Sequence, residues 1–304
     1  MRSPMKLTAL VLSLTTLLLV ACGKSSPKTQ PSASSTAVTK DATIAAEVPA
    51  AIASNGTLNV ATDASYAPDE FFDTDNTTII GMDIDLLNAI ATVMGLKTKY
   101  TNQTFNGIIP SLQAGRFDVS ISSFTDNKDR EKVVDFVDYF QAGASIFVKS
   151  DSTESFTNLD ELCGKAVSVE KGTTELDDAT AGSAKCVKDG KAKITVLSFD
   201  DQNQTNLAVI SGRAVASLAD SQVAAYQVKL TNGQVKVTGD YLAPAPYGIA
   251  IPRPAGAALG SGSLTKAIFD ALQKLIVDGT YKRILDKWGT SAGALAAAKI
   301  NGAA

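Results

Sequence analysis

Hydrophobic and polar positions follow two different periodicities along the chain. A short apolar run at 57–61 is typical of a strand, whereas apolar residues at 82–94 recur every three or four positions, as on one face of a helix. Gly95 stands where a helix stop is expected. The same reasoning predicts further strands at 97–101 and 117–121 and a helix at 108–114. This alternation indicates parallel α/β layering.

The alternation returns in the second half of the chain. Strands are predicted at 166–169, 194–197, 214–218 and 247–251, and helices at 175–181, 202–211, 221–230, 265–277, 281–288 and 292–299. The pattern predicts two α/β lobes, with the second inserted into the first. Ligand sites in such sheets lie at the carboxyl ends of strands, and two facing lobes form a cleft suited to a small molecule.

The N-terminus has the features of an export signal. Arg2 and Lys6 precede an uncharged run at 7–20, which is short for a membrane span. The run ends in LVACG, which resembles a bacterial lipoprotein signal. That resemblance implies a signal peptide at 1–21 and a lipid on Cys22. An ordinary signal peptide with an incidental cysteine is the alternative.

The segment at 22–54 is predicted to be a flexible tether between the lipid and the folded part. It is rich in Ser, Thr, Ala and Pro, and it offers few large apolar side chains that could offset the entropy of ordering. We therefore expect an extracytoplasmic protein, anchored by lipid to the outer face of the bacterial cytoplasmic membrane rather than crossing it.

The composition excludes several classes of function. The chain has no histidine, so His-based acid–base catalysis and most zinc sites are excluded. The formal net charge is −3, and it becomes −5 without Arg2 and Lys6 (26 basic against 31 acidic residues), which provides no field for nucleic acid. Neither a metal site nor a cofactor is expected.

Eight short motifs in order along residues 55–290 resemble the polar-amino-acid (family 3) solute-binding proteins of bacterial ABC transporters. They are ATDASYAP at 61–68, GMDIDL at 81–86, FNGIIPSL at 105–112, SSFT at 122–125 followed by Arg130, KGTTE at 171–175, LAD at 218–220, YGIA at 247–250 and DGTY at 278–281.

The resemblance implies a two-lobe periplasmic-binding-protein-like fold of type II, hinged, with the ligand in the interlobe cleft. Lobe 1 would comprise 55–141 and 247–304, and lobe 2 would comprise 145–242. The hinge crossovers would lie at 142–146 and 243–247, where Pro244 and Pro246 suit a crossover better than a helix or a central strand.

The resemblance also implies a set of ligand-binding residues. By family position, Arg130 would hold the α-carboxylate of an amino acid, and Asp220, on the other lobe, would accept from its α-ammonium group. Guanidinium suits a carboxylate because it donates two parallel hydrogen bonds. The other predicted contacts are Asp63, Tyr66, Asp83, Phe105, Ser122, Ser123, Thr125, Thr173 and Thr174.

Several of these residues have simpler interpretations. Asp83 could cap a helix, Tyr66 and Phe105 could be core residues, and Glu175 could be a first-turn helix acid. An acidic, aromatic-walled end of the pocket favours a cationic amino acid or glutamine over glutamate. Because the chain has no Walker A motif, the permease and its ATPase would be separate chains, and the receptor itself is expected to be a monomer.

A transport receptor is expected to carry out no catalysis. Two other functions remain open. A few proteins of this fold are cyclohexadienyl dehydratases, for which Glu175 or Asp63 would act as general acid. A sensor or adhesin domain is the third possibility, but no attached signalling domain supports it.

Cys163 and Cys186 remain as an even pair in the exported part of the chain. They flank the first strand and helix of lobe 2. We predict that they form a disulfide, with two free buried thiols as the alternative.

Overall fold

The computed structural model describes residues 37–253, 256 and 258–303, without the side chains of 241–243. The predicted signal peptide at 1–21 and the lipidation of Cys22 lie outside the described residues. Val38–Ala304 form one compact unit, to which the following description applies. In the part of the chain that is described, none of the helices is long and apolar enough to cross a membrane.

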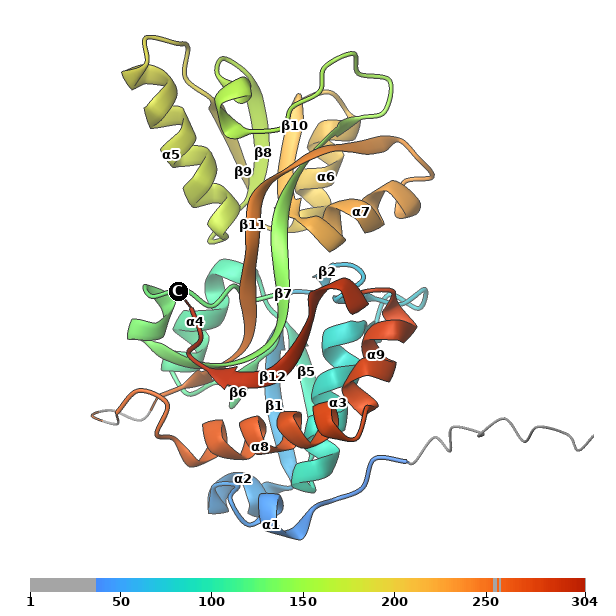
Figure 1. The fold of residues 1–304 in the computed structure, drawn as a ribbon, viewed down its shortest axis with the longest axis vertical. Coiled ribbons are helices and arrows are strands. Elements are labelled where there is room, and N and C mark those ends of the chain that lie inside the picture. The colour runs from blue at the N-terminus through green and yellow to red at the C-terminus, as the bar shows by residue number, and fades with distance from the viewer. Residues whose placement is uncertain (1–36, 254–255, 257, 304) are drawn as a thin grey trace, which may run out of the picture. The chain divides into compact units, whose positions relative to one another are not determined.

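Two long antiparallel strands carry both lobes. β7 (Val134–Lys149) and β11 (Val235–Pro252) pair along almost their whole length and run from one lobe into the other (Figure 1). They belong to a sheet with the strand order β5-β1-β6-β11-β7-β10-β8-β9, and β12 pairs with β7. Each lobe therefore has its own parallel strands on a shared antiparallel pair.

The remaining strands divide between the lobes. Lobe 1 contains β1 (Thr57–Thr62), β5 (Lys97–Asn102), β6 (Val119–Ser120), β12 (Ala294–Ile300) and a small separate sheet of β2 (Ser65–Tyr66), β3 (Glu70–Phe72) and β4 (Ile79–Ile80). Lobe 2 contains β8 (Ala166–Glu170), β9 (Thr195–Phe199) and β10 (Ala216–Asp220). The pairs β1–β5, β1–β6, β8–β9 and β8–β10 are parallel, as the alternation of strands and helices predicts.

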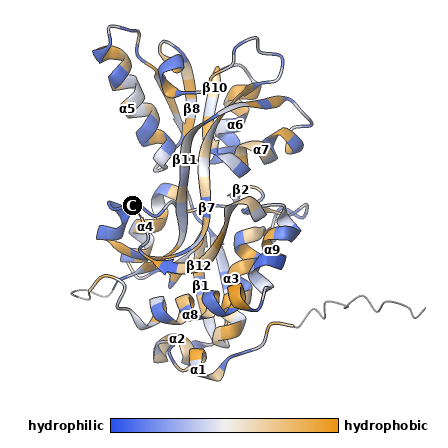
Figure 2. Cartoon of the chain, in the orientation of Figure 1, coloured by the Kyte–Doolittle hydropathy of each residue, from blue (hydrophilic) through white to orange (hydrophobic). Residues whose placement is uncertain are grey.

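Helices cover the sheet in each lobe. Those of lobe 1 are α1 (Ala42–Ala45), α2 (Ala50–Asn55), α3 (Met82–Met94), α4 (Phe105–Gln113), α8 (Ser263–Val277) and α9 (Thr280–Trp288), with the 3₁₀ turns η1 (Arg130–Lys132) and η3 (Ser291–Gly293). Those of lobe 2 are α5 (Thr174–Lys188), α6 (Gln202–Ile210) and α7 (Ser221–Leu230), with η2 (Leu159–Leu162). Figure 2 shows hydrophobic and hydrophilic residues alternating along α8, as expected of a helix with one buried face.

The sequence pattern locates α3 correctly. Leu86, Ile90 and Val93 recur at helical spacing, and all are buried. The helix stops at Gly95, whose φ of 74° is left-handed and easily adopted by glycine. The two-lobe α/β fold class is confirmed.

The hydrophobic core forms three clusters, one of which joins the lobes. That shared cluster includes Phe105 and Ile108 from α4 of lobe 1 together with Val209 and Val223 from lobe 2. The lobes are therefore in direct apolar contact around the candidate site.

The structure corrects two predictions about secondary structure. The tether expected to reach residue 54 ends earlier, because Ile44 and Val48 are buried in the core of lobe 1 and α1 and α2 lie on it. The helix expected at 292–299 is the strand β12, antiparallel to β7. Its alanines favour a helix intrinsically, but pairing with an available strand overrides that weak preference.

The predicted crossovers fall within the long strands rather than in loops. Ala142 of β7 pairs with Ala245 of β11, and the register of the pair shifts between Leu242 and Ala245. Pro244 lies in this irregularity, where the ladder is interrupted and a missing N–H is tolerated, and Pro246 follows it, opposite Gln141. Whether the lobes bend at 142–146 and 243–247 stays a prediction.

The disulfide prediction is confirmed. Cys163 and Cys186 are bonded, with their Cα atoms 5.6 Å apart, and the bridge ties the segment before β8 to α5. It closes a loop with a sequence separation of 23 residues.

Replacing both bridged cysteines with serine should lower the free energy of unfolding by about 3 kcal/mol, because the unfolded chain regains the freedom that a loop of this length removes. Urea unfolding of the wild type and of the Cys163→Ser, Cys186→Ser variant measures the difference. A reducing agent should lower the wild-type midpoint to that of the variant and leave the variant unchanged. Equal midpoints for the oxidised wild type and the variant would contradict this expectation.

Candidate functional site

Side chains from both lobes surround a small cavity of about 10 Å³. Its lining comprises Tyr66, Phe105, Ser123, Thr125 and Arg130 from lobe 1 and Thr173, Thr174, Glu175 and Asp220 from lobe 2. Eight of the eleven ligand-binding residues predicted from the sequence are thus brought together. The other three, Asp63, Asp83 and Ser122, lie elsewhere.

Arg130 is the basic residue of this cavity, and it is held in place by backbone and aromatic contacts. It begins η1, and its Nη1 and Nη2 donate to the carbonyl oxygens of Thr125 (2.7 Å) and Gly172 (2.9 Å). Its guanidinium carbon lies 4.8 Å from the ring centre of Phe124 and 5.4 Å from that of Phe105. Burial lowers the pKa of Arg130, but a guanidinium stays charged in proteins. The site therefore presents a fixed cation.

Arg130 also touches the opposite lobe at a point of close approach. Gly172 has a φ of 81°, and a Cβ atom placed on it would lie 2.8 Å from Cβ of Asn106 in lobe 1. A side chain at this position would both strain the backbone and collide with lobe 1. Glycine thus allows the Gly172 carbonyl to reach Arg130.

Asp220 contributes a carboxylate from lobe 2. It ends β10 and precedes α7, yet it makes no side-chain capping bond to that helix. Burial raises its pKa well above the usual value, and the nearby Glu175 raises it further, whereas Arg130 opposes the rise. A cation in the cavity would favour the ionised form of this group.

Glu175 completes the charged lining, although it was not among the predicted ligand contacts. Its side chain is 6% exposed and lies in the first turn of α5, where Oγ1 of Thr174 is 3.3 Å from its Oε2. Burial raises the pKa of Glu175, and Arg130 partly offsets this. The signal in the sequence was its position directly after Thr173 and Thr174, because consecutive residues at a helix start share one end of the helix.

The three remaining predicted residues support the lining from behind. Asp63 accepts from the Ser65 hydroxyl (2.6 Å) and from the backbone N–H of Phe105 (3.0 Å). Ser122 accepts from the backbone N–H of Asp63 (2.8 Å). These contacts fix the start of α4, and with it the ring of Phe105.

Asp83 plays a similar supporting part. Its Oδ2 accepts from the backbone N–H of Ser123 (3.0 Å) and from the Tyr139 hydroxyl (2.6 Å). It lies in the first turn of α3 and is fully buried. Asp83 was predicted to contact the ligand, but it is not among the residues that line the cavity. Asp83 instead holds the strained turn at Ser123, whose φ is 47°.

A layer of buried carboxyl groups lies behind the cavity. It comprises Asp63, Asp69, Glu70, Asp83 and Glu170, each 3% exposed or less. Burial is the main reason that their pKa values rise, to about 8 for Asp69 and about 10 for Glu170, and neighbouring acids add to it. No ion pair in the described part of the chain involves these residues. Asp69 and Glu170 are therefore protonated for much of the time at neutral pH.

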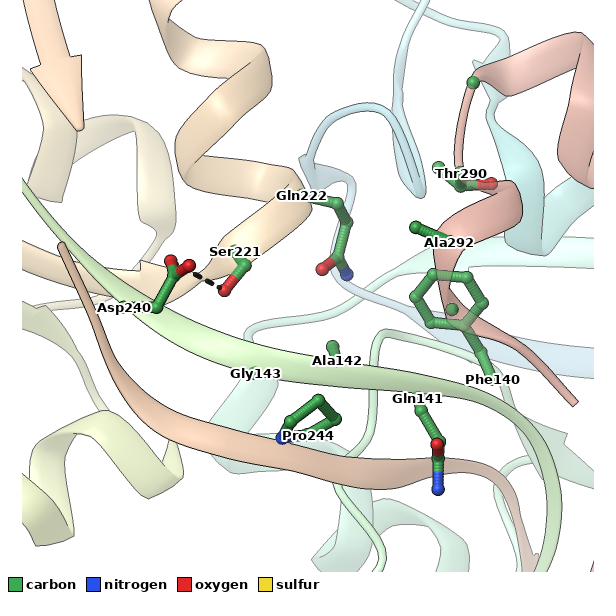
Figure 3. Close-up of a pocket in the computed structure, with 12 residues that line it drawn as sticks. Phe140, Gln141, Ala142, Gly143, Ser221, Gln222, Asp240, Pro244, Thr290 and Ala292 are labelled. Carbon is green, nitrogen blue, oxygen red and sulfur yellow. Dashed lines mark hydrogen bonds between the residues drawn. The ribbon is translucent and has the colours of Figure 1, made fainter.

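A second, roomier cavity of about 380 Å³ lies beside the crossovers (Figure 3). It is lined largely by small and apolar groups such as Ala142, Gly143 and Pro244. The carboxylate of its one charged residue, Asp240, is 3.4 Å from the Ser221 hydroxyl. Because convergent charged groups mark binding sites better than volume does, the smaller cavity is the candidate site. No cluster of potential metal ligands occurs among the residues that were located.

Comparison with known proteins gives consistent results. Residues 58–291 match the model of the bacterial extracellular solute-binding proteins, family 3. The arginine-binding protein ArgT of Corynebacterium glutamicum is 39% identical over 259 residues, which are 85% of this chain and 82% of ArgT.

Two solved structures are similar in fold and sequence. An ancestral arginine-binding protein bound to arginine has a TM-score of 0.68 and 38% identity, and one bound to glutamine has a TM-score of 0.69 and 36% identity. Each comparison covers 77% of this chain and 98% of the other.

The layer of buried acids generates a prediction about pH. Carboxyl groups titrate near 4 in the unfolded chain, whereas the folded-state pKa values are about 8 for Asp69 and about 10 for Glu170. The folded state therefore binds protons that the unfolded state has released. The stabilisation is fully present below the unfolded values and is lost as the pH rises through the folded ones. The free energy of unfolding should decrease from pH 5 to pH 9.

Urea unfolding at pH 5, 7 and 9 measures this slope. Glu170→Gln should flatten it, because the amide cannot ionise. Asp177→Asn, at an exposed position in α5, is the matched control and should leave the slope unchanged. An identical slope for Glu170→Gln and the wild type would refute the assignment.

Proposed function

The chain belongs to the family 3 bacterial extracellular solute-binding proteins, and we propose that it captures a cationic amino acid, arginine in particular, for an ABC importer. The observation that carries this proposal is the placement of Arg130 and Asp220 on one cavity from opposite lobes. The family and the relatives support a polar amino acid as ligand, with a cationic side chain or glutamine favoured.

The two ends of a free amino acid suit this pair. Burying an ionised carboxylate or ammonium is costly unless each group is paired. Arg130 would bind the α-carboxylate and Asp220 the α-ammonium group. Because the two residues lie on different lobes, the ligand would make its full set of contacts only when the lobes are together. Binding would therefore favour the closed arrangement.

The charge of the cavity favours a cationic side chain. Arg130 contributes one positive charge, and Asp220 and Glu175 contribute two negative charges when ionised. An amino acid with a neutral side chain would leave one acid without a partner, so that acid would have to bind a proton. The guanidinium of arginine would pair with it directly. A glutamate side chain would add a further negative charge and should be rejected.

The aromatic wall adds a surface for a long side chain. The rings of Tyr66 and Phe105 meet edge to face, with their centres 5.9 Å apart. The buried hydroxyl of Tyr66 interacts with the carboxyl group of Glu170, which holds the ring in place. Guanidinium stacks favourably on aromatic faces, so a ligand with a guanidinium group suits this wall.

In this proposal the protein binds and releases its ligand without chemistry, as a receptor rather than an enzyme. A permease and an ATPase on separate chains would complete the transporter, and a lipid on Cys22 would tether a monomeric receptor outside the cell. A dehydratase activity would require Glu175 or Asp63 to act as general acid. Formation of phenylpyruvate from prephenate by the purified chain would favour that activity instead.

Arginine should raise the melting temperature and glutamate should not. Arg130→Ala should weaken arginine binding by about 2–5 kcal/mol, because it removes the partner of a buried carboxylate. Isothermal titration calorimetry measures the loss. Lys132→Ala, at an exposed lysine in the same 3₁₀ turn, is the control. Unchanged affinity in Arg130→Ala would rule out this site.

Glu175→Gln should shift the preference of the site from arginine towards glutamine. Removal of one negative charge takes away the proposed partner of the guanidinium and leaves an amide beside the ligand. Calorimetry measures the dissociation constants of glutamine and arginine. The constant of glutamine divided by that of arginine should fall at least about tenfold, the equivalent of one charged hydrogen bond. Asp177→Asn, two residues away and exposed, should keep the wild-type ratio. If both variants keep the wild-type ratio, Glu175 does not determine which ligand side chain the site prefers.

A further inference from the structure

A single glutamine connects the two lobes beside the candidate site. Gln222 lies in the first turn of α7 in lobe 2. Its Nε2 donates to Oδ2 of Asp69 (2.7 Å), which belongs to lobe 1, and to the hydroxyl of Tyr247 (2.9 Å), which lies where the predicted crossover at 243–247 meets lobe 1. One amide group thus connects the start of α7 both to lobe 1 and to the crossover.

Asp69 depends on this contact. Its side chain is fully buried, and Oδ2 accepts from Gln222 and from the Ser123 hydroxyl (3.0 Å), whereas Oδ1 has no partner among the described residues. Removing the glutamine would leave Ser123 as the remaining donor to a buried carboxyl group. Leaving a buried polar group unpaired costs more than an average hydrogen bond contributes.

The partners of Gln222 lead to the residues that line the cavity. Asp69 is hydrogen-bonded to Ser123, and the Tyr247 hydroxyl interacts with the carboxylate of Asp220. Ser123 and Asp220 both line the cavity, one from each lobe. Gln222 itself is not part of that lining. It borders the roomier cavity at the crossovers, where Figure 3 shows it projecting from the start of α7.

We propose that Gln222 is a positioning residue, an interlobe clasp that sets how firmly the protein holds its ligand without touching that ligand. Its hydrogen bond to Asp69 joins the two lobes and would be lost when they separate, so it shifts the population towards closure. A ligand that needs the closed state then binds more tightly, in proportion to the fraction already closed. The same bonds orient Tyr247 and Ser123 against the cavity.

The experiment uses the full chain with Gln222→Ala. Gln234→Ala, at an exposed glutamine of lobe 2, is the matched control. Small-angle X-ray scattering without ligand reports how far apart the lobes lie, and stopped-flow fluorescence with calorimetry reports the dissociation rate and affinity for arginine. Gln222→Ala should give a larger radius of gyration. It should release arginine about three to ten times faster, the effect of one or two buried hydrogen bonds.

A double-mutant cycle separates the clasp from a general loss of stability. Asp69→Ala alone should also weaken binding, but the loss in the double variant should be smaller than the sum of the two single losses, because both changes break the Gln222–Asp69 contact. The melting temperature of unliganded Gln222→Ala should stay within about 2 °C of the wild type, since separation of the lobes would return Asp69 to water instead of leaving it buried with one donor fewer.

The binding readouts of this inference rest on the proposed function, whereas the scattering readout does not. If the wild-type protein binds no amino acid, the proposed function is refuted. The scattering comparison of the unliganded wild type and Gln222→Ala would still test the clasp. Scattering and arginine release identical to those of the wild type in Gln222→Ala would overturn the clasp. Additive effects in the double mutant would overturn it as well.

Discussion

The site depends on the guanidinium of Arg130, which is half-buried among backbone carbonyls and aromatic rings. Arg130 makes no ion pair in the part of the chain that is described, and it donates to two backbone carbonyls, one in each lobe. Carbonyl dipoles and aromatic faces hold the cation in place, and the carboxyl groups of Glu175 and Asp220 lie near enough to interact with its charge. A carboxylate that enters the cavity meets a donor that is already oriented. Arg130 therefore needs little rearrangement when a ligand binds, which lowers the free-energy cost of binding.

The fold explains how residues far apart in sequence meet at this point. Asp220 ends a strand and Glu175 begins a helix, and both lie at the end of lobe 2 that faces lobe 1. Because β7 and β11 continue through both lobes, these ends are aligned with the start of α4 and with η1. The cores of the two lobes also merge around Phe105 and Val209. Shared strands and a shared apolar cluster thus bring the two halves of the site into register.

Resemblance to the family motifs located most of the residues that line the cavity. Arg130, Asp220 and the two threonines at the start of α5 were predicted in this way. Asp63 and Asp83 could not be told apart from ligand-contacting residues by their residue type or their spacing in the sequence. Whether a carboxylate faces the cavity or the backbone behind it depends on tertiary packing. Asp63 bonds to the backbone of α4 rather than facing the cavity. Local preference also failed for β12, where pairing with β7 outweighed an alanine-rich sequence.

Gly172 has a consequence for how sequence variation in this protein is interpreted. It contributes no functional group, yet its lack of a side chain determines how closely the lobes can approach, since Cβ would lie 2.8 Å from Asn106. An alanine there would act as a spacer between the two halves. Weaker binding in such a variant would resemble the loss of a ligand contact although every contacting group remained. The backbone Cα of Asn106 would also lie 2.9 Å from that Cβ, so a smaller residue at position 106 would not remove the collision and only glycine fits at 172.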